Sequence, residues 1–427
     1  MGEMKDSGNQ WIGIIPFGWS IDRFKYCTIL YTGNSIKDER KNDYEDAFFA
    51  KPYISSKDIN RLFSTINYEN GLYIKNNDYS FRVARKNDIL MCIEGGSAGK
   101  KKALLNQDVC FVNKLCCFHS NYKVKHEFLF YYLCNPAYED EFDYNITGMI
   151  GGVSVSRLSN LNIVYPKIDE QKRIAAYLDE QCKKIDEIMV DIQSQIDTLE
   201  DYKKSVISEA VTKGLDPDAV MKDSGISYIG KIPSSWKTDK GKYIFTYLEK
   251  PTRENDGVIT CFRDGEVTLR SNRREDGFTI SEKEIGYQGI DIGDLIVHGM
   301  DGFAGAIGIS DSRGKASPVL NVLETTNNKR YYMYFLRNMA YRGVFVAIAT
   351  GIRVRTCDTN WGKLREIVYA IPPRDEQDKI AEYIDSRCGE IDSIIENKKA
   401  QLETIENYKK SLIYEYVTGK KKVPENE

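Results

Sequence analysis

The chain has 427 residues, and 41% of them are hydrophobic, which is enough for two to four domains with buried cores. No run of 18 apolar residues occurs and the first ten residues lack an apolar segment, so neither a membrane span nor a secretory signal is expected. A net charge of −3 argues at first against a nucleic-acid binder. The ten cysteines lack the spacing of a disulfide framework and predict reduced thiols in a cytoplasm.

The first 19 residues form a leader that recurs later in the chain. Residues 4–19 match residues 221–236 at ten of sixteen positions, including an Ile-Pro pair and a closing tryptophan. Self-similarity of this kind marks a duplicated architecture. We therefore expect two halves, each of which begins with the leader.

Residues 20–165 are predicted to form a first α+β domain, with β-type runs before a helical run that ends at Asn135-Pro136. A glycine-rich turn after Glu94 leads into three lysines. It is not a nucleotide-binding P-loop, because Glu94 and Lys101 stand where that motif needs Gly and Ser or Thr. The turn suits contact with DNA phosphate, although a solvated hairpin explains it equally well. The candidate DNA-binding residues here are Lys100, Lys101 and Lys102.

The end of this domain, residues 147–157, combines glycines with serines and an arginine. Arginine reads guanine bidentately and serine can add contacts to bases, whereas a solvated polar face is the plainer alternative. The candidates are Ser154, Ser156 and Arg157.

A long polar helix is predicted within a spacer and linker, residues 166–220. Apolar residues recur every seven positions with a second apolar row between them, which is the seam of a coiled coil about 60 Å long. Gly214 and Pro217 end the helix. The seam residues are Leu178, Cys182, Ile185, Met189, Ile192, Ile196, Leu199 and Val206.

Residues 221–372 contain the second leader and a second α+β domain. Its predicted strands and helix follow the order of the first domain, but the residues differ, so we expect one fold made twice for two different targets. Two arginine clusters are candidates for base contacts, with a solvated charged face as the alternative. These arginines are Arg270, Arg273, Arg274, Arg353 and Arg355.

A second long helix is predicted in the last segment, residues 373–427. Residues 375–418 match residues 169–212 at 22 of 44 positions, and Lys398 is a polar break in the repeated seam. Two such helices would bury their seams on each other. A pseudo-two-fold axis would make the pair antiparallel and hold the domains at opposite ends, whereas two-helix packing inside one globular domain is the alternative.

Signals for catalysis are weak. Asn135-Pro-Ala-Tyr138 falls one residue short of a DNA amino-methyltransferase signature, and no glycine-rich cofactor strand precedes it. The Asp-Glu-Gln sequences at the two helix starts fit the positive end of a helix better than a nuclease site. The cysteines and histidines of residues 110–126 lack paired Cys-x-x-Cys spacing, which favours buried thiols over zinc. The chain is therefore predicted to be non-catalytic, with no cofactor or metal of its own.

Charge is distributed unevenly along the chain. Each long helix has 6 basic and 11 acidic residues, whereas residues 237–370 have 20 basic and 17 acidic residues. Acidic spacers with mildly basic domains are compatible with DNA binding.

These features together resemble the specificity subunit of type I restriction–modification enzymes over almost the whole chain. The resemblance is carried by both leaders, the Pro…Asp-Glu-Gln…Ile-Ala…Tyr helix starts, Asn-Asp-Ile-Leu at 87–90, Gly-Asp-Leu-Ile at 293–296 and Gly-Ile-Arg-Val-Arg at 351–355. It implies two similar target-recognition domains separated by two long helices that form an antiparallel coiled coil. Each domain would read half of a bipartite, asymmetric site in double-stranded DNA.

The resemblance also implies partners. Two methylation subunits would dock on the helices, bind S-adenosylmethionine and methylate adenine N6, and a restriction or translocase subunit would use ATP and Mg. A protein-binding scaffold and a self-contained DNA methyltransferase or nuclease are the alternatives. The candidate partner-binding residues are Gln171, Tyr202, Lys203, Gln377, Tyr408 and Lys409.

Overall fold

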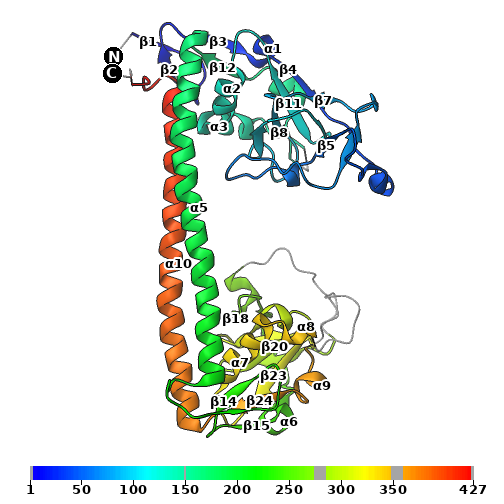
Figure 1. Cartoon of the computed structure of the whole chain (residues 1–427), viewed down its shortest axis with the longest axis vertical. Coiled ribbons are helices and arrows are strands. Elements are labelled where there is room, and N and C mark those ends of the chain that lie inside the picture. The colour runs from blue at the N-terminus through cyan, green and yellow to red at the C-terminus, as the bar shows by residue number, and fades with distance from the viewer. Residues whose placement is uncertain (1–2, 149–150, 274–284, 348–358, 425–427) are drawn as a thin grey trace. The chain divides into compact units, whose positions relative to one another are not determined.

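The structure is a computed structural model that describes residues 3–148, 151–273, 285–347 and 359–424. The chain divides into two compact units. Unit 1 contains residues 1–193 and 399–427, and unit 2 contains residues 194–398. Each unit therefore holds one leader, one α+β domain and a segment of each long helix (Figure 1). No helix in the described ranges is both long enough and apolar enough to cross a bilayer.

The core of unit 1 is a four-stranded antiparallel sheet in the order β4–β11–β8–β9. Strand β8 is buried on both faces, which explains its continuous apolar sequence. Ile89 and Met91 face a cluster with helices α2 and α3, whereas Leu90 and Cys92 face a second sheet, β6–β5–β10–β7. The strands are β4 (Thr28–Thr32), β5 (Ala50–Ile54), β6 (Tyr73–Lys75), β7 (Val83–Ala84), β8 (Ile89–Cys92), β9 (Lys102–Leu104), β10 (Val109–Phe111) and β11 (Leu115–Ser120).

The remaining elements of unit 1 connect this domain to the leader and to the long helices. The leader is an antiparallel hairpin, β1–β2, and strand β3 pairs with β12 just before the first long helix. Asn135 caps α3 by accepting a hydrogen bond from the Tyr138 amide, so the Asn-Pro-Ala-Tyr sequence is a helix start. The elements are β1 (Met4–Asp6), β2 (Ile14–Pro16), β3 (Ser20–Arg23), α1 (Phe24–Cys27), η1 (Asp38–Tyr44), η2 (Ser56–Asp58), α2 (His126–Leu133), α3 (Pro136–Tyr144), α4 (Val155–Leu158) and β12 (Asn162–Tyr165).

Unit 2 repeats this plan with different residues. Its central sheet has the order β16–β23–β20–β21, which corresponds strand for strand to β4–β11–β8–β9. Leu295 and Val297 of β20 join the cluster with helix α7, whereas Ile296 joins the cluster on the opposite face. The elements are β13 (Met221–Asp223), β14 (Lys231–Pro233), β15 (Lys237–Lys240), α6 (Gly241–Ile244), β16 (Thr246–Leu248), β17 (Ile259–Cys261), β18 (Val267–Leu269), η3 (Arg270–Asn272), β19 (Gln288–Ile290), β20 (Leu295–His298), η4 (Gly302–Ala304), β21 (Ile307–Ile309), β22 (Gly314–Ala316), β23 (Leu320–Glu324), α7 (Lys329–Tyr341), α8 (Val344–Ala347), α9 (Trp361–Leu364) and β24 (Val368–Ile371).

The two long helices are α5 (Ile168–Lys213) and α10 (Arg374–Val417), and they are antiparallel within each unit (Figure 1). In unit 1, Tyr177 contacts Tyr416 and Asp186 contacts Lys409, so residue numbers fall on one helix as they rise on the other. The predicted seam is buried, because Leu178, Cys182, Ile185 and Met189 share a core cluster with Leu412 and Ile413. The antiparallel coiled coil predicted from the sequence is confirmed.

A buried carboxyl group joins the first leader to α3. Glu141 is 4% exposed, and its Oε2 accepts a hydrogen bond of 2.9 Å from Asn9 Nδ2. Burial raises the pKa of the Glu141 carboxyl above its ordinary value near 4.5, and the bond from Asn9 opposes part of that rise. The leader is therefore held against α3 by a group that binds a proton more tightly when folded.

This raised pKa predicts how stability changes with pH. The folded state holds the Glu141 proton more tightly than the unfolded chain, so Glu141 lowers stability as pH rises from about 4.5 through its folded pKa. The side chain that Glu141→Gln introduces does not ionise. The stability of this variant relative to the wild type is therefore expected to increase as pH rises from about 4.5 through the folded pKa of Glu141. Urea unfolding free energies at several pH values measure the difference, with the exposed Glu69→Gln as a control for loss of one charge. A difference that does not change with pH would contradict the prediction.

Candidate DNA and assembly interfaces

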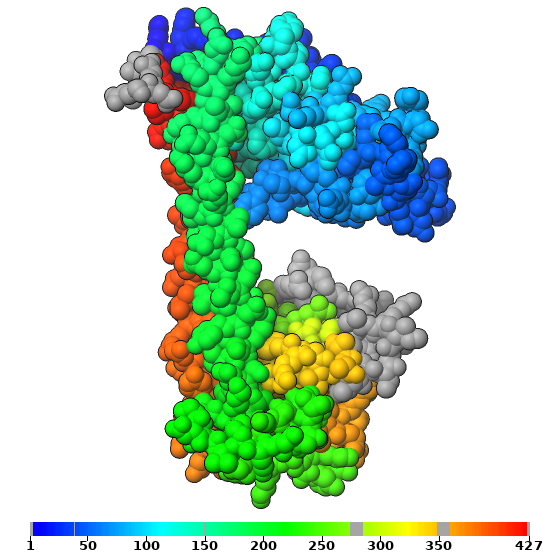
Figure 2. Space-filling model, viewed as in Figure 1, coloured from blue at the N-terminus to red at the C-terminus, as the bar shows by residue number. Residues whose placement is uncertain are grey.

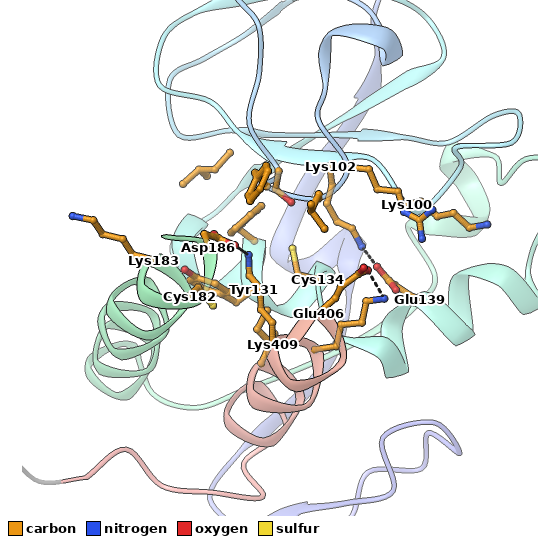
Figure 3. Close-up of a pocket in the computed structure, with 18 of the residues that line it drawn as sticks. Lys100, Lys102, Tyr131, Cys134, Glu139, Cys182, Lys183, Asp186, Glu406 and Lys409 are labelled. Atoms are coloured by element: carbon orange, nitrogen blue, oxygen red, sulfur yellow. Dashed lines mark hydrogen bonds and ion pairs between the residues drawn. The ribbon is translucent and has the colours of Figure 1, made fainter. Parts of the chain in front are cut away.

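The three predicted lysines of domain 1, residues 20–165, have different environments, and Figure 3 shows two of them, Lys100 and Lys102. Lys100 is exposed, and the Lys101 ammonium donates to the Ser56 carbonyl at 2.8 Å. Lys102 is 3% exposed, because β9 turns its side chain inward to the Leu133 carbonyl at 2.6 Å and the Glu139 carboxylate at 2.7 Å. An ammonium used in this way is not available to phosphate, so we leave Lys102 out of the proposed DNA interface.

The second cluster of domain 1 lies on the short helix α4. Ser154 caps this helix, with its hydroxyl accepting a hydrogen bond from the Arg157 amide at 3.3 Å. Arg157 also donates to the Asn145 carbonyl, but its side chain and that of Ser156 are exposed. The three predicted residues therefore lie together on a surface.

Domain 2 is the α+β domain that follows the second leader within residues 221–372. Its predicted arginines that the structure describes make intramolecular contacts. Arg273 forms ion pairs with Asp264 at 2.6 Å and Glu266 at 3.0 Å, and its guanidinium lies 4.2 Å from the centre of the Phe262 ring. Arg270 lies 3.4 Å from the Thr260 hydroxyl. A contact to DNA would have to replace the ion pairs of Arg273. Arg274, Arg353 and Arg355 lie outside the described residues.

The two predicted partner-binding glutamines are buried at the starts of the long helices. The Gln171 amide donates to the Pro166 and Lys123 carbonyls, and its oxygen accepts from the Lys125 amide. Gln377 repeats the arrangement in unit 2, where its amide donates to the Pro372 carbonyl and its oxygen accepts from the Asn328 amide. Their exposed fractions are 0% and 1%. Both glutamines fasten a long helix to the loop before α2 or α7, and no atom remains on the surface for a partner.

The two predicted partner-binding lysines join the long helices to each other. Lys409 of α10 pairs with Asp186 of α5 at 2.5 Å in unit 1, and Lys203 of α5 pairs with Asp392 of α10 at 2.6 Å in unit 2. Both members of the second pair stand 206 residues from their counterparts in the first. The repeated Tyr-Lys-Lys-Ser sequence therefore helps to hold the helices in antiparallel register.

These pairs are expected to contribute little stability. A double-mutant cycle with Lys409→Met and Asp186→Asn should give a coupling of about 0.2–1 kcal/mol, because both groups are partly solvated. The more exposed pair of Lys203 and Asp392 serves as the matched comparison and should give the smaller value. Urea unfolding at low and high salt measures both couplings. A coupling that salt does not weaken would contradict a screened surface pair.

The two predicted tyrosines are exposed, and two isoleucines of the long helices are exposed at repeated positions. Tyr202 is 47% and Tyr408 is 59% exposed, whereas Ile188 and Ile394 are 50% and 45% exposed. Asp186 lies on the flank of α5 that faces domain 1. Ile188 follows Asp186 by two residues, which places the Ile188 side chain about 200° around the helix from that flank. Figure 2 shows a face of α5 that neither domain covers. We name Ile188 with Tyr408 outer face 1, and Ile394 with Tyr202 outer face 2.

Sequence reasoning missed both isoleucines, although a signal was present. Ile188 and Ile394 occupy corresponding positions in the two helix copies but lie outside the heptad seam. Apolar residues retained at a position that packing does not require are candidates for contact with a partner.

The described cysteines are free, and most are buried. Burial raises the pKa of the Cys110 thiol to about 11 and that of Cys116 to about 12, which disfavours the thiolate form that binds metal. The structure shows no group of three or more potential metal ligands within the ranges it describes.

Comparison with known proteins gives consistent matches. Residues 27–198 match the family described as "Type I restriction modification DNA specificity domain". The chain is 26% identical over 346 residues, 76% of its length and 74% of the relative's, to the putative type I restriction enzyme MjaX specificity subunit of Methanocaldococcus jannaschii. It is 28% identical over 168 residues, 38% of this chain and 36% of the relative, to the type I restriction enzyme MjaVIII specificity subunit of the same organism. A chain in a solved structure of a type I R-M system has the same fold, with a TM-score of 0.63 at 14% identity over 95% of this chain and 99% of that one.

Proposed function

We propose that this chain is the specificity subunit of a type I restriction–modification system and that it reads a bipartite, asymmetric site in double-stranded DNA. A specificity subunit selects DNA and is not itself an enzyme. The proposal assigns one half of the site to domain 1 and the other half to domain 2.

The observation that carries this proposal is the duplicated fold with divergent residues. The order β4–β11–β8–β9 recurs as β16–β23–β20–β21, while the residues around the two sheets differ. A shared scaffold with different surface residues suits two related readers of different base sequences, because specificity comes from side chains that reach base edges. Two identical domains would instead favour a symmetric site.

We assign the DNA contacts to basic and hydroxyl side chains of each domain. In domain 1 the α4 surface offers hydroxyl and guanidinium groups, and the turn before β9 offers two lysines for phosphate. In domain 2 the arginines after β18 and those before α9 are assigned the same roles. The proposed residues are Lys100, Lys101, Ser154, Ser156, Arg157, Arg270, Arg273, Arg274, Arg353 and Arg355.

The long helices are proposed as the assembly surface and as the spacer that sets the distance between half-sites. Each outer face combines a tyrosine and an isoleucine, residue types that suit a partner's apolar surface. Two corresponding faces would receive two methylation subunits, one for each unit. Those subunits would bind S-adenosylmethionine and methylate adenine, and a separate restriction or translocase subunit would use ATP and Mg.

The test is a map of methylated adenines. The chain is expressed with its methylation subunits in a host that lacks other adenine methyltransferases, and the host DNA is sequenced with detection of methylated bases. We expect one motif with two defined parts separated by a spacer of constant length. In a second chain, residues 20–165 are replaced by the first domain of a different specificity subunit, and only one part of the motif should change.

Three outcomes would contradict the proposal. A single uninterrupted motif would remove the assignment of one half-site to each domain. Methylation by the chain without partners would favour a self-contained methyltransferase. If the chain assembles with its partners but shows no salt-dependent binding to the methylated duplex, it acts as a protein scaffold instead.

A further inference from the structure

A cavity of about 710 Å³ lies inside unit 1, where domain 1 meets the two long helices. Its wall is formed by β9, α2 and α3 of the domain, by the loop around Phe63, and by α5 and α10. Figure 3 shows Lys102, Cys134, Glu139, Tyr131 and Lys409 gathered around this space. Pockets that hold small molecules are typically about 300–1,000 Å³, so the volume fits such a ligand.

The repeat allows the wall of the cavity to be compared with the corresponding place in unit 2. Tyr131 of α2 bonds to Asp179 of α5, and Tyr334 of α7 bonds to Asp385 of α10 in the same way. One turn further along the helix, unit 2 has Arg337, whose guanidinium donates to the Ile307 carbonyl at 2.7 Å.

Unit 1 has Cys134 at the position of Arg337, with a much shorter side chain. The Arg337 side chain packs closely on Gly265. A Cβ atom added to Gly265 would lie 1.6 Å from Arg337 Nη2. The cavity therefore lies next to a position where the other copy of the fold has a large side chain.

The inner wall of the cavity is largely neutral. The Lys102 ammonium pairs with Glu139, and the Lys409 ammonium pairs with Asp186. Six cations and six carboxylates line the space, so the lining has no net formal charge. Lys100 and Lys183 point away from the space in Figure 3. Apolar side chains complete the wall, namely Leu62, Phe63, Leu104, Phe130, Val190 and Ile413.

We propose that this cavity is a binding site for a small, uncharged and mainly apolar molecule. Its apolar body would contact Phe63, Leu104 and Ile413, and a single hydrogen-bond donor would reach the Glu139 carboxylate. A charged ligand is disfavoured, because the paired groups of the wall offer it no counter-charge. A bound molecule contacts domain 1 and both helices, so it stabilises unit 1. The proposal does not depend on DNA recognition.

The test uses the full-length chain and indole, an uncharged aromatic with one N–H donor. Binding is measured by saturation-transfer NMR and by protection of Cys134 from N-ethylmaleimide, with the Cys134 peptide followed by mass spectrometry. The filling variant is Cys134→Phe and the size-matched control is Cys134→Ser. Indole should bind the wild type and the serine variant with affinities within about threefold, because the cavity volume is unchanged. The phenylalanine variant should bind at least about tenfold more weakly, because its ring occupies the cavity.

A second filling variant keeps the test valid if Cys134→Phe does not fold. Val190 lines the cavity from α5 but is 53% exposed, so Val190→Trp fills the space without a change in the core. Equal indole affinity in all variants, or no binding to the wild type at millimolar indole, would overturn the proposal. It would also be overturned if only the methylation subunits protect Cys134, because the cavity would then receive a partner side chain.

Discussion

Replacing Trp236 with alanine is expected to destabilise unit 2 by about 3–5 kcal/mol, the range for loss of a large aromatic from a core. Trp236 ends the second leader and is 0% exposed, with its ring against Tyr331 of α7 and beside Gly214 at the end of α5. It therefore joins the leader, the recognition domain and a long helix. A loss of this size should appear as an early phase in urea unfolding of the full chain.

The indole nitrogen of Trp236 allows a more specific version of this prediction. Nε1 is buried and has no hydrogen-bond partner among the described residues, so Trp236→Phe loses ring volume but no hydrogen bond seen there and should cost less than the alanine variant. Trp19 is the counterpart in unit 1, packs against Phe128, and should show the same order of effects. Tyr243→Ala, at a 70% exposed side chain, is the control and should change stability little. Equal effects of Trp236→Ala and Tyr243→Ala would contradict the role of the leader as an anchor.

Removal of one outer face is expected to eliminate one of two methylation subunits from the complex. The double variant Ile188→Ala with Tyr408→Ala removes outer face 1 and leaves outer face 2 intact. Truncation of a central interface residue costs about 2 kcal/mol or more, which corresponds to roughly 30-fold weaker binding. Native mass spectrometry of the chain mixed with methylation subunits near the wild-type Kd should then show one subunit per chain in place of two.

The repeat provides the matched experiments. Ile394→Ala with Tyr202→Ala should also leave one methylation subunit, and the four-residue variant should leave none. Tyr122→Ala with Tyr144→Ala is the control, because these tyrosines are 84% and 76% exposed but lie in domain 1. Unchanged stoichiometry in the four-residue variant would show that the methylation subunits dock elsewhere. Loss of assembly in the control would point to domain 1.

The repeat made the long helices predictable, but not the use of each repeated residue. Gln171 and Gln377 recur at equivalent positions, and recurrence suggested a shared partner. Both are buried and bond to the loops before α2 and α7. A duplicated residue can be retained for a contact within each copy as well as for an external partner. Only the three-dimensional neighbours of a side chain separate these two roles.

Three adjacent lysines illustrate the same limit within domain 1. Residues 100–102 are alike in sequence, and a basic turn suggested phosphate contact for all three. Lys102 begins β9, and the alternation of side chains along a strand turns it into the protein, where Glu139 lies 2.7 Å away. That partner is 37 residues further along the chain, so local sequence could not reveal it.

The sequence by itself determined the duplication, the α+β class and the two long helices, because heptad spacing and fixed-offset identity are properties of residue order. Their antiparallel pairing followed only from an assumed pseudo-two-fold axis and from the family resemblance, and the structure decided it. The tertiary structure alone decided which repeated polar groups are buried and which apolar groups stay exposed on the helices. It also decided that the junction of unit 1 is hollow beside Cys134 while Arg337 occupies the corresponding place in unit 2. These properties depend on which distant segments meet, and a side chain's role follows from the partners that packing places within its reach.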